Sequence, residues 1–462
     1  MWIFEFAKKR KKILIALAIF VVLCVTAVFL VGGDKKTIGI KSLSVLNKVS
    51  NLLPIPADEK KELEVINKLV QEFTKKDDVE RSFMIFLQNN MELRPGGGFL
   101  GQYAIIKTKN GEVTSTFLED ANLLDQRITA KISPPYPFKR MMQIKKWKFR
   151  DSNFSPDFPT NVDKAKYFYR LSGRSGEFDG FVAVNSDVFN HVLELTGPIT
   201  VSGHTFTGEN GALKLEEVVE KAYIMNPELD TQNRKAIMRQ MAPLIVDGLF
   251  SLGNISKIAD FVHKEFKNRN IMVNFTDSRL QAAVEEAHWD GKMAADWGGD
   301  YLMMVDANMG SLKTDYYIKR EVAYDINLTG EKPVATLNIL YKNTAPYGDW
   351  RTSDYHSYLR IYIPKGSNLL DRKMVSYPNV GEEFGKTYMG FTCHVVMGTQ
   401  TAAMIKYELP ADFNRDDYRL LIQKQSGVGN IPVKVHLKTK DGEFNQEQVL
   451  NNDLKFEFRN NE

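Results

Sequence analysis

The first segment whose residues could do chemistry is a glycine-rich stretch at 88–101, between two apolar runs. Glu92 and Arg94 stand beside three consecutive glycines, Gly96, Gly97 and Gly98. Consecutive glycines permit backbone conformations that other residues avoid, and the N–H groups of such a loop can surround an anion. The segment is therefore either a loop that binds an anionic substrate or a connecting loop whose shape a Glu92–Arg94 ion pair fixes.

The second segment, 147–159, mixes aromatic residues with Arg150, Asp151 and Asp157 and has no regular period. Loops of this kind often carry function. An arginine can bind phosphate through two parallel hydrogen bonds, and an aspartate can hold Mg²⁺. The alternative is that Arg150 forms a buried salt bridge with an acidic residue.

The third segment, 230–240, begins a predicted helix, with Asp230 suited to its cap and Arg234 one turn further on. Arg234 and Arg239 are five residues apart, which is about 140° around a helix. They cannot point the same way, so at most one of them faces a shared site directly. The alternative for each arginine is a place on the solvated face of the helix.

Strand-like and helix-like runs alternate around these segments, from 82 to 320. Strands are expected at 82–88, 102–108, 112–118, 179–185, 199–203, 271–275 and 300–307. Helices are expected at 160–171, 186–195, 213–224, 231–250, 256–267 and 277–288. One apolar stripe on the helix at 231–250 is formed by Ile237, Met241, Leu244, Ile245 and Leu249. Asn110-Gly111 fits a tight primed turn between two strands. The alternation indicates an α/β domain, with helices on the faces of a layered sheet.

After Arg320 the helical period disappears, and strand-like runs follow one another, separated by Gly, Pro, Asp and Asn. They are expected at 314–328, 334–343, 355–364, 387–397, 401–409, 418–425 and 432–440. Such spacing predicts an all-β antiparallel sandwich of the immunoglobulin-like size class. The α/β domain is placed at 80–315 and the sandwich at 316–462.

The formal net charge of +4 belongs to the first dozen residues. Residues 1–12 sum to +4, through five basic residues against one glutamate, whereas 37–462 carry −1. Residues 13–31 are uncharged and as a helix would span about 28 Å, close to the hydrocarbon core of a bilayer. They predict one N-terminal transmembrane helix; a cleaved signal peptide, with a shorter apolar region, is the less favoured alternative.

The distribution of basic residues around this span predicts its orientation. Five basic residues precede it and two follow it, so the amino terminus is expected in the cytoplasm and the bulk of the chain outside the cell. Residues 1–12 are then a cytoplasmic tail, and 32–79 form a juxtamembrane stalk and helix. The −1 balance of the outer part predicts no nucleic-acid binding.

Several other kinds of site lack support in the sequence. The seven histidines are scattered without metal-ligand spacing. Cys24 lies in the predicted span and Cys393 in the outer part, so these two cysteines cannot pair. The sequence contains no G-x-x-x-x-G-K-[ST] loop, no H-E-x-x-H and no G-x-S-x-G.

The segments described above resemble a bacterial family of unknown function whose members are membrane-anchored surface proteins. Its pattern is close to Q-N-N-x-E-L-R-x-x-G-G-F-x-G, followed by an R-D-x-x-x-x-P-D-F-P-like stretch, an aspartate–glycine strand and a T-G-P turn. This chain has QNNMELRPGGGFLG at 88–101, RDSNFSPDFP at 150–159, Asp179-Gly180 and Thr196-Gly197-Pro198. A later family pattern is similar to GGDYLMMVDANMGSLKTDYY at 298–317. The resemblance covers about 80–462.

A weaker similarity is to the LytR–CpsA–Psr family of cell-wall phosphotransferases, which have a short cytoplasmic tail, one membrane helix and an external α/β domain. Residues 178–201 and Arg150-Asp151 are similar to segments of that family. The helix that carries Asp230, Arg234, Arg239 and Gln240 is similar to a third segment. That family moves a glycopolymer from a polyprenyl pyrophosphate onto peptidoglycan, with magnesium.

This second resemblance implies a site that binds pyrophosphate. Its cations would be Arg94, Arg150, Arg234 and Arg239, and Glu92 or Asp151 would hold Mg²⁺. Arginines and magnesium stabilise the charge that builds on departing oxygens. The sequence departs from that family, because 220–225 reads EKAYIM where an arginine-x-arginine segment is expected. The departure weighs against catalysis more than against the fold.

Two functions are therefore predicted. The favoured one is a non-catalytic, membrane-anchored envelope module whose sandwich binds surface polysaccharide or another surface protein. The alternative is a phosphotransferase or pyrophosphatase that acts on a polyprenyl-pyrophosphate-linked glycopolymer during cell-wall assembly, with Arg94, Arg150, Glu92 and Asp151 as its catalytic residues.

Overall fold

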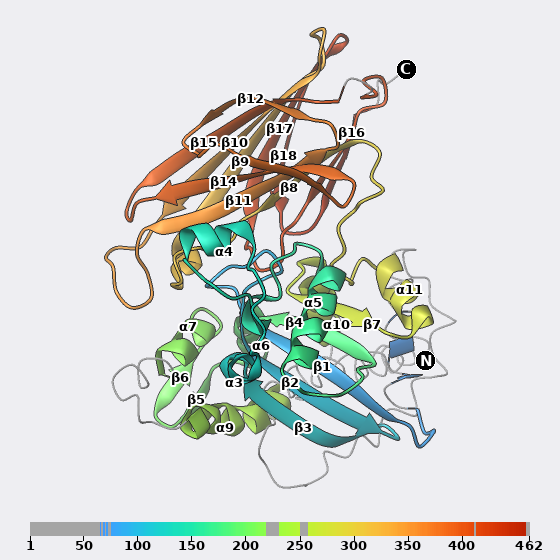
Figure 1. The fold of residues 1–462 in the computed structure, drawn as a ribbon, viewed down its shortest axis with the longest axis vertical. Helices are drawn as coiled ribbons and strands as arrows, with labels where there is room; N and C mark the ends of the chain where they lie inside the picture. Colours follow the sequence, from blue (N-terminus) through green and yellow to red (C-terminus); the bar gives the residue numbers. More distant parts are fainter. Residues whose placement is uncertain are drawn as a thin grey trace, which may run out of the picture.

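The computed structural model describes residues 75–218, 231–249, 257–410 and 413–458, together with positions 65, 68, 69, 71 and 72. The predicted tail at 1–12 and membrane span at 13–31 lie outside these residues, so both remain predictions. Within the described part of the chain, no helix combines the length and the apolar character needed to cross a bilayer. The described part has two bodies along its long axis, one of sheet and helices and one of strands (Figure 1).

The first body is built on a five-stranded sheet of order β3-β2-β1-β4-β7. β1 (Glu80–Asn89) is parallel to β4 (Gly180–Asn185) and antiparallel to β2 (Phe99–Lys109). β3 (Glu112–Asp120) and β7 (Ile271–Phe275) form the two edges and pair in antiparallel fashion. Between β2 and β3, Asn110 and Gly111 both have positive φ, of 55° and 79°, as a primed turn requires. This predicted hairpin is confirmed.

Alternate residues of β1 point to opposite faces of the sheet, because side chains alternate along a strand. Phe83 and Ile85 belong to one apolar cluster, and Met84 and Phe86 belong to another. The first cluster includes residues of α6 (Asp187–Thr196), α7 (Gly211–Glu216), α9 (Thr231–Leu249), α10 (Ile258–Lys267) and α11 (Ser278–Glu286). The second includes residues of α3 (Ala121–Arg127) and α5 (Phe158–Leu171). The predicted mixed architecture, a sheet with helices on its faces, is confirmed.

Some local predictions need correction. In the apolar stripe of α9, Leu244 is 43% exposed, whereas Ile237, Met241, Ile245 and Leu249 are buried. The four buried residues are spaced by four, and each such step rotates the position by 40° around the helix axis. The buried face therefore turns away from the side that carries Leu244. The short helices α3 and α4 (Tyr136–Met141) were not predicted. The strand at 199–203 is β5 (Ile199–Val201), which forms a small hairpin with β6 (His204–Phe206). Of the helix predicted at 213–224, positions 219–224 lie outside the described residues.

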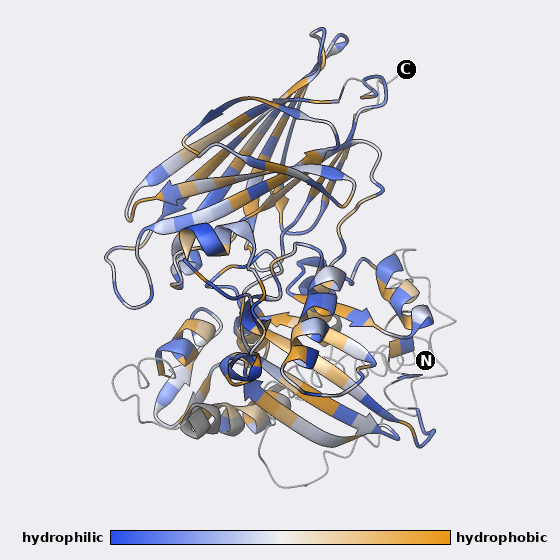
Figure 2. Ribbon diagram, in the orientation of Figure 1, coloured by the Kyte–Doolittle hydropathy of each residue, from blue (hydrophilic) through white to orange (hydrophobic). Residues whose placement is uncertain are grey.

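The second body consists of two six-stranded sheets, of order β12-β15-β10-β9-β17-β18 and β13-β14-β11-β8-β16-β19. The strands of the first sheet are β9 (Ile318–Asn327), β10 (Val334–Asn343), β12 (Asn368–Lys373), β15 (Gln400–Glu408), β17 (Ile431–Thr439) and β18 (Gly442–Leu450). Those of the second are β8 (Asp300–Val305), β11 (Tyr355–Pro364), β13 (Asn379–Glu383), β14 (Lys386–Val395), β16 (Arg419–Gln423) and β19 (Leu454–Glu457). One apolar core contains residues of both sheets. Hydropathy alternates along several strands, as a sheet with one buried face requires (Figure 2).

The strand predicted at 300–307 was expected in the sheet of the α/β domain. It is instead β8, a strand of the second body. It pairs with β11 on one side and with β16 on the other. All six of its residues are buried, because Leu302 and Met304 face the sandwich core and Tyr301 and Met303 face a separate apolar cluster. A fully apolar run indicates burial on both faces but does not indicate which sheet receives the strand.

Candidate functional site

Arg94, the first predicted site residue, lies wholly inside the protein, where the two bodies meet. Its side chain is 1% exposed. Nη2 donates to Glu92 Oε1 at 2.8 Å, and Nη1 donates to the backbone oxygen of Asn308 at 3.0 Å. Nε lies 3.5 Å from Asp151 Oδ1. Arg94 therefore links the glycine-rich segment both to the second predicted segment and to the chain that leaves β8.

The charges of this cluster compensate one another. Burial alone would lower the pKa of Arg94, but the carboxylates of Glu92 and Asp151 raise it overall. Burial raises the pKa of Asp151, against the opposing effects of Arg94 and Arg150. Glu92 and Asp151 were also the predicted magnesium ligands. As they lie, both contact the Arg94 guanidinium, and this arrangement fits a buried arginine better than a divalent cation.

The three glycines form a packed turn. The N–H of Gly96 donates to Asn153 O at 3.0 Å, and that of Gly97 donates to Arg94 O at 2.9 Å. Gly97 has φ +130°, and a Cβ there would overlap the side chains of Gln88 and Asn185. A Cβ on Gly96 or Gly98 would likewise overlap neighbouring atoms. Two of the N–H groups expected to bind an anion thus already have protein acceptors.

Arg150 makes the kind of salt bridge that the sequence left open as an alternative. Its Nε donates to Asp125 Oδ2 at 2.5 Å, and the Asp125 side chain is fully buried. Burial raises the pKa of Asp125, and the Arg150 interaction opposes that rise. The remaining oxygen, Oδ1, accepts from the N–H of Phe149 at 2.8 Å. Sequence reasoning missed Asp125, although an aspartate within the apolar run ANLLD was a usable signal.

Arg234 and Arg239 lie on α9, and their side chains are outside the described residues. The helix itself is placed, and its buried residues join the cluster that contains Phe83 and Ile85. Phe149, next to Arg150, joins the cluster on the opposite face of the sheet. The structure therefore brings Arg94, Arg150, Glu92 and Asp151 together, and it places the helix of the other two arginines across the sheet.

The segments at 88–101 and 298–317, which the sequence singled out separately, bind each other. The N–H of Asn308 donates to Leu93 O at 2.9 Å, and the N–H of Leu93 donates to Asp315 Oδ2 at 3.1 Å. Asp315 and Asp306 both form ion pairs with the buried Arg320, at 3.1 and 2.8 Å. The segments 88–101 and 298–317, with Arg320, thus form a buried polar interface between the two bodies, called the joint below.

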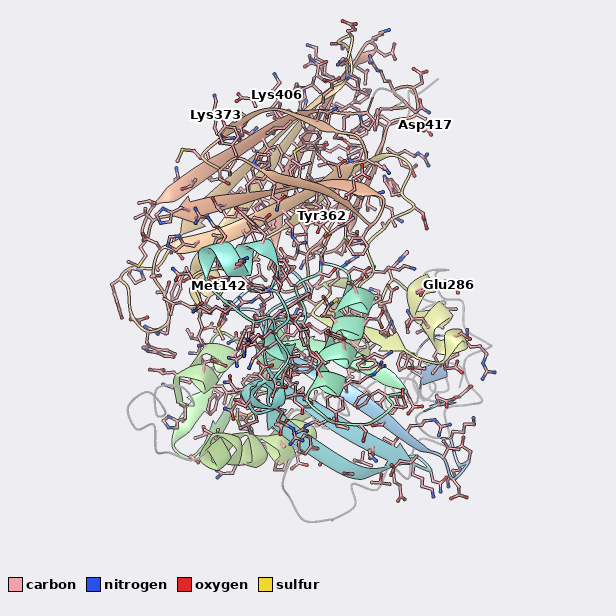
Figure 3. The ribbon with its side chains drawn as sticks, viewed as in Figure 1. Met142, Glu286, Tyr362, Lys373, Lys406 and Asp417 are labelled. Carbon is pink, nitrogen blue, oxygen red and sulfur yellow. The ribbon has the colours of Figure 1, made fainter. Side chains whose placement is uncertain are left out.

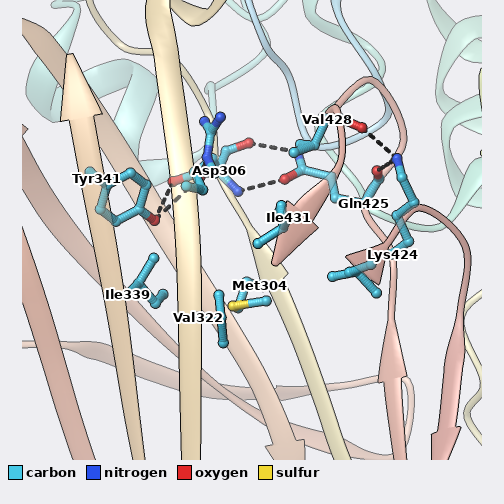
Figure 4. A pocket seen from close by; sticks show the side chains of 11 residues that line it. Met304, Asp306, Val322, Ile339, Tyr341, Lys424, Gln425, Val428 and Ile431 are labelled. Atoms are coloured by element: carbon cyan, nitrogen blue, oxygen red, sulfur yellow. Dashed lines mark hydrogen bonds and ion pairs between the residues drawn. The ribbon is translucent and has the colours of Figure 1, made fainter. Parts of the chain in front are cut away.

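A third chain segment completes the joint, and no sequence signal marked it. Gln425 Nε2 donates to Arg94 O at 3.2 Å and to Asp306 O at 2.8 Å, and its Oε1 accepts from the N–H of Asp306 at 2.8 Å. Ser426 accepts a hydrogen bond from Asn185 Nδ2 at 3.0 Å. Figure 4 shows Gln425 and Asp306 beside a closed cavity of about 10 Å³, which has room for about one water molecule.

An open cleft of about 440 Å³ lies beside this joint, where α4 meets β11. From the α/β body it is lined by Pro135, Tyr136, Pro137, Trp147, Ser152, Phe154, Ser155, Thr160, Asn161 and Lys164. From the sandwich it is lined by Tyr358, Arg360, Asn379, Glu383, Phe384 and Tyr388. Six of these side chains are aromatic, and the Tyr136 and Tyr358 rings are 6.1 Å apart. Tyr136 is 51% exposed, so an aromatic face is open to a ligand.

Eight of the sixteen residues that line the cleft, leaving the tyrosines aside, are polar or charged. Arg360 is buried, lies over the Phe154 ring at 4.7 Å, and donates through Nη2 to Phe154 O at 2.7 Å. Burial raises the pKa of Tyr358 to about 12, so its hydroxyl keeps its proton at neutral pH. Among the described residues, Ser152 Oγ and Arg360 Nε have no hydrogen-bond partner. Aromatic walls combined with placed polar groups are typical of a small-molecule or sugar-sized site.

The second predicted segment contributes to this cleft, but not through the residues singled out in it. Trp147, Ser152, Phe154 and Ser155 line the cleft, whereas Arg150 and Asp151 do not. The sandwich residues were missed. Tyr358 and Arg360 belong to the run YHSYLRIYIP, which was predicted only as a strand of the sandwich.

Fold and site together define a class of protein: an α/β domain joined to a β-sandwich by a buried polar network, with an aromatic cleft between them. A family model described as "Protein of unknown function (DUF4012)" matches residues 78–223 of this chain. The predicted resemblance to a family of unknown function is thus supported over that range. No curated protein sequence is similar enough to match the chain.

Three solved bacterial structures show a distant similarity. They are protein gbs0355 from Streptococcus agalactiae, the Lin1025 protein from Listeria innocua, and a protein from Bacillus subtilis titled the transcriptional regulator yvhJ. Their identities are 13, 14 and 13%, and their TM-scores are 0.27, 0.24 and 0.25. Each covers 46% of this chain, and the chain covers 74, 78 and 77% of them.

Proposed function

We propose that this protein is a non-catalytic cell-envelope module that binds surface polysaccharide in the cleft between its two domains. The observation that carries the proposal is the lining of that cleft, which combines six aromatic side chains with eight polar or charged ones. Aromatic rings offer rigid apolar faces on which the C–H side of a sugar ring can pack. The neighbouring hydroxyl, amide and guanidinium groups can then bond to sugar hydroxyls.

The state of the predicted catalytic residues supports binding over group transfer. Arg94 and Arg150 each pair with buried carboxylates, and two N–H groups of the glycine loop bond to protein carbonyls. To hold a pyrophosphate, these arginines would first have to leave partners inside the protein, which is costly. No observation in the described residues favours the phosphotransferase alternative or the finer LytR–CpsA–Psr likeness.

The membrane anchor and the location outside the cell belong to the same proposal. Their support is the uncharged run at 13–31, with five basic residues before it and two after it. An anchored protein with a glycan-binding cleft would hold polymer close to the membrane surface. Protease treatment of intact cells should then digest the two domains and spare the first dozen residues.

A binding panel tests the proposed function. Full-length protein in detergent is titrated with neutral and charged polysaccharides, and Tyr136→Ala is compared with Tyr347→Ala. Tyr347, 61% exposed on a loop of the sandwich and outside the cleft, is a matched control. We expect Tyr136→Ala to weaken binding at least tenfold, or about 1.4 kcal/mol, and Tyr347→Ala to leave it unchanged. Failure of every polysaccharide to bind would overturn the proposal, as would magnesium-dependent turnover of a polyprenyl pyrophosphate substrate.

A further inference from the structure

A strongly basic segment borders the cleft on the α/β side. Residues 139–150 read KRMMQIKKWKFR, with six cationic residues and no acidic one. Four of the six have exposed side chains, and these are Lys139, Arg140, Lys145 and Lys146. The other two have protein partners: Lys148 Nζ donates to Asp125 O at 2.7 Å, and Arg150 pairs with the Asp125 carboxylate.

None of the four exposed cations forms an ion pair with another described residue. They stand on a short segment whose two ends are in the cleft, since Pro135–Pro137 line it before the segment and Trp147 lines it after. The N–H of Trp147 donates to Ile132 O at 2.8 Å, and that of Ile144 donates to Phe138 O at 3.1 Å. Phe138 is buried, with its ring 4.7 Å from that of Phe154. The basic segment therefore forms a loop held by its own backbone hydrogen bonds, and this loop packs beside the cleft.

The acidic groups at the cleft do not offset these charges. Among the lining residues Glu383 is the single carboxylate, and it lies 3.6 Å from Arg360 Nη1 and accepts from Tyr362 OH at 2.9 Å. Lys164, which lines the cleft from α5 of the same domain, adds a further cation with its Nζ 4.6 Å from the Trp147 ring centre. Unpaired charges of one sign beside a recess raise the local concentration of ligands of the opposite sign.

We propose that the ligand of the cleft is a polyanionic glycan or polyol polymer, with repeated carboxylate or phosphodiester groups that bind the segment 139–146. This inference rests on the proposed function, because the aromatic cleft binds the sugar rings and the basic segment binds the charges that follow along the polymer. Four separate flexible cations suit repeated charges along a chain better than one small anion, which would need a convergent fork.

The test removes the four charges and keeps the cleft. The variant K139Q/R140Q/K145Q/K146Q is compared with K319Q/K342Q/K373Q/K406Q, which removes four exposed lysines from the first sandwich sheet. Figure 3 shows Lys373 and Lys406 on the side of the sandwich away from Met142, which lies in the basic segment. Full-length protein is titrated with polygalacturonate, with poly(glycerol phosphate), with neutral dextran and with single-stranded DNA, and far-UV circular dichroism checks folding.

We expect wild-type protein to bind at least one of the anionic polymers. Its affinity should be at least tenfold weaker at 300 mM than at 50 mM salt, because counterions of the polymer are released on binding. The 139–146 variant should lose at least tenfold, and the sheet variant should lose less than twofold. The two anionic polymers tell whether carboxylates or phosphodiesters are recognised. Equal binding of dextran and both polyanions, with no effect of the variant, overturns this inference and leaves the proposed function standing. Tighter binding of single-stranded DNA than of either polymer overturns it too, and binding of no polymer overturns both.

Discussion

Arg94 is the residue on which the joint between the two domains most depends. Its guanidinium lies between Glu92 and Asp151, and it also donates to the backbone of Asn308. Removing one partner of a buried ionic cluster leaves charge in a medium of low polarity, and the remaining charges then oppose folding. The same residue would be nearly irrelevant to stability if it were a solvated substrate clamp.

Arg94→Ala should therefore lower the free energy of unfolding by about 3–5 kcal/mol, since two carboxylates lose their buried cation. Denaturant unfolding followed by tryptophan fluorescence measures the change. Arg140→Ala is the control, because Arg140 is exposed and should change stability by less than about 0.5 kcal/mol. Equal stability of the Arg94→Ala variant and the wild type would contradict a structural role.

Asp300 makes stability depend on pH. Burial raises its pKa to about 6, although Tyr418 and Tyr324 donate hydrogen bonds to its Oδ2 at 2.6 and 2.8 Å. In the unfolded chain the same group ionises near its ordinary value of 3.8. The native state therefore holds the proton longer than the unfolded state, and its contribution to stability, fully present below pH 3.8, is lost as the pH rises through about 6.

Asp300→Asn should abolish this dependence, because an amide cannot ionise. Between pH 4 and 7 the wild type should lose about 2.4 kcal/mol more than the variant, which is most of what a shift of about two pKa units implies. Urea midpoints measured at four pH values give the two slopes. If the unfolding free energies of the wild type and the variant changed equally with pH, Asp300 would not titrate as its buried site requires.

At this scale the sequence indicated one ion pair as an alternative but did not indicate the other partners of the buried arginines. The Glu92–Arg94 pair was foreseen as an alternative because both residues flank one short loop. Asp125 and Gln425 were not foreseen, because each meets its partner only after distant segments pack together. The residues lining the cleft were likewise invisible as a set, since they come from two domains.

Among the elements, the turn at 96–98 is tightly constrained. Gly97 combines a positive φ with side chains on both sides, so a methyl group there meets both backbone strain and overlap. Gly173, after α5, also has positive φ, but it has open space around its Cβ position. A comparison of Gly97 with Gly173 therefore separates backbone strain from steric overlap.

Gly97→Ala should cost more stability than Gly173→Ala. Strain alone predicts about 1–3 kcal/mol at either position, and overlap with Gln88 and Asn185 adds to the loss at Gly97. Thermal unfolding of the two variants makes the comparison. A larger loss at Gly173 would show that the 96–98 turn is looser than described.

Elements with strong local signals were predictable, and those defined by tertiary contacts were not. The β2–β3 hairpin follows from Asn110-Gly111, and α5 was predicted over 160–171. The helix begins two residues earlier, at Phe158, and its cap was not predicted: Asp157 Oδ2 accepts from the N–H of Thr160 at 3.1 Å. β8 was expected in the wrong sheet, because an apolar strand pairs equally well with either until the chain between 287 and 299 is placed. The short α4 lacks a side-chain cap and was missed.

At the scale of the whole molecule, the two domains share one buried polar network and one cleft. The network joins segments near 94, 306 and 425, so its residues are far apart in the sequence. Its effect is to fix the α/β wall of the cleft against the sandwich wall. The sequence predicted an α/β domain followed by a β-sandwich. The sandwich was expected to be antiparallel, but β16 pairs with β8, and β17 with β9, in parallel fashion. The sequence did not predict that the proposed binding cleft lies between the two domains.

The central claim is that the aromatic cleft, and not the buried cluster of Arg94, Arg150, Glu92 and Asp151, binds the ligand. One titration separates these two sites, with the polysaccharide that wild-type protein binds most tightly. It compares Tyr136→Ala with a double variant that combines Asp125→Asn and Arg150→Ala. The double variant removes both partners of the Arg150 salt bridge, so no buried charge is left uncompensated. We predict that Tyr136→Ala loses at least tenfold in affinity while the folded double variant stays within threefold of the wild type. Loss of binding in the double variant, with Tyr136→Ala unchanged, would contradict the account.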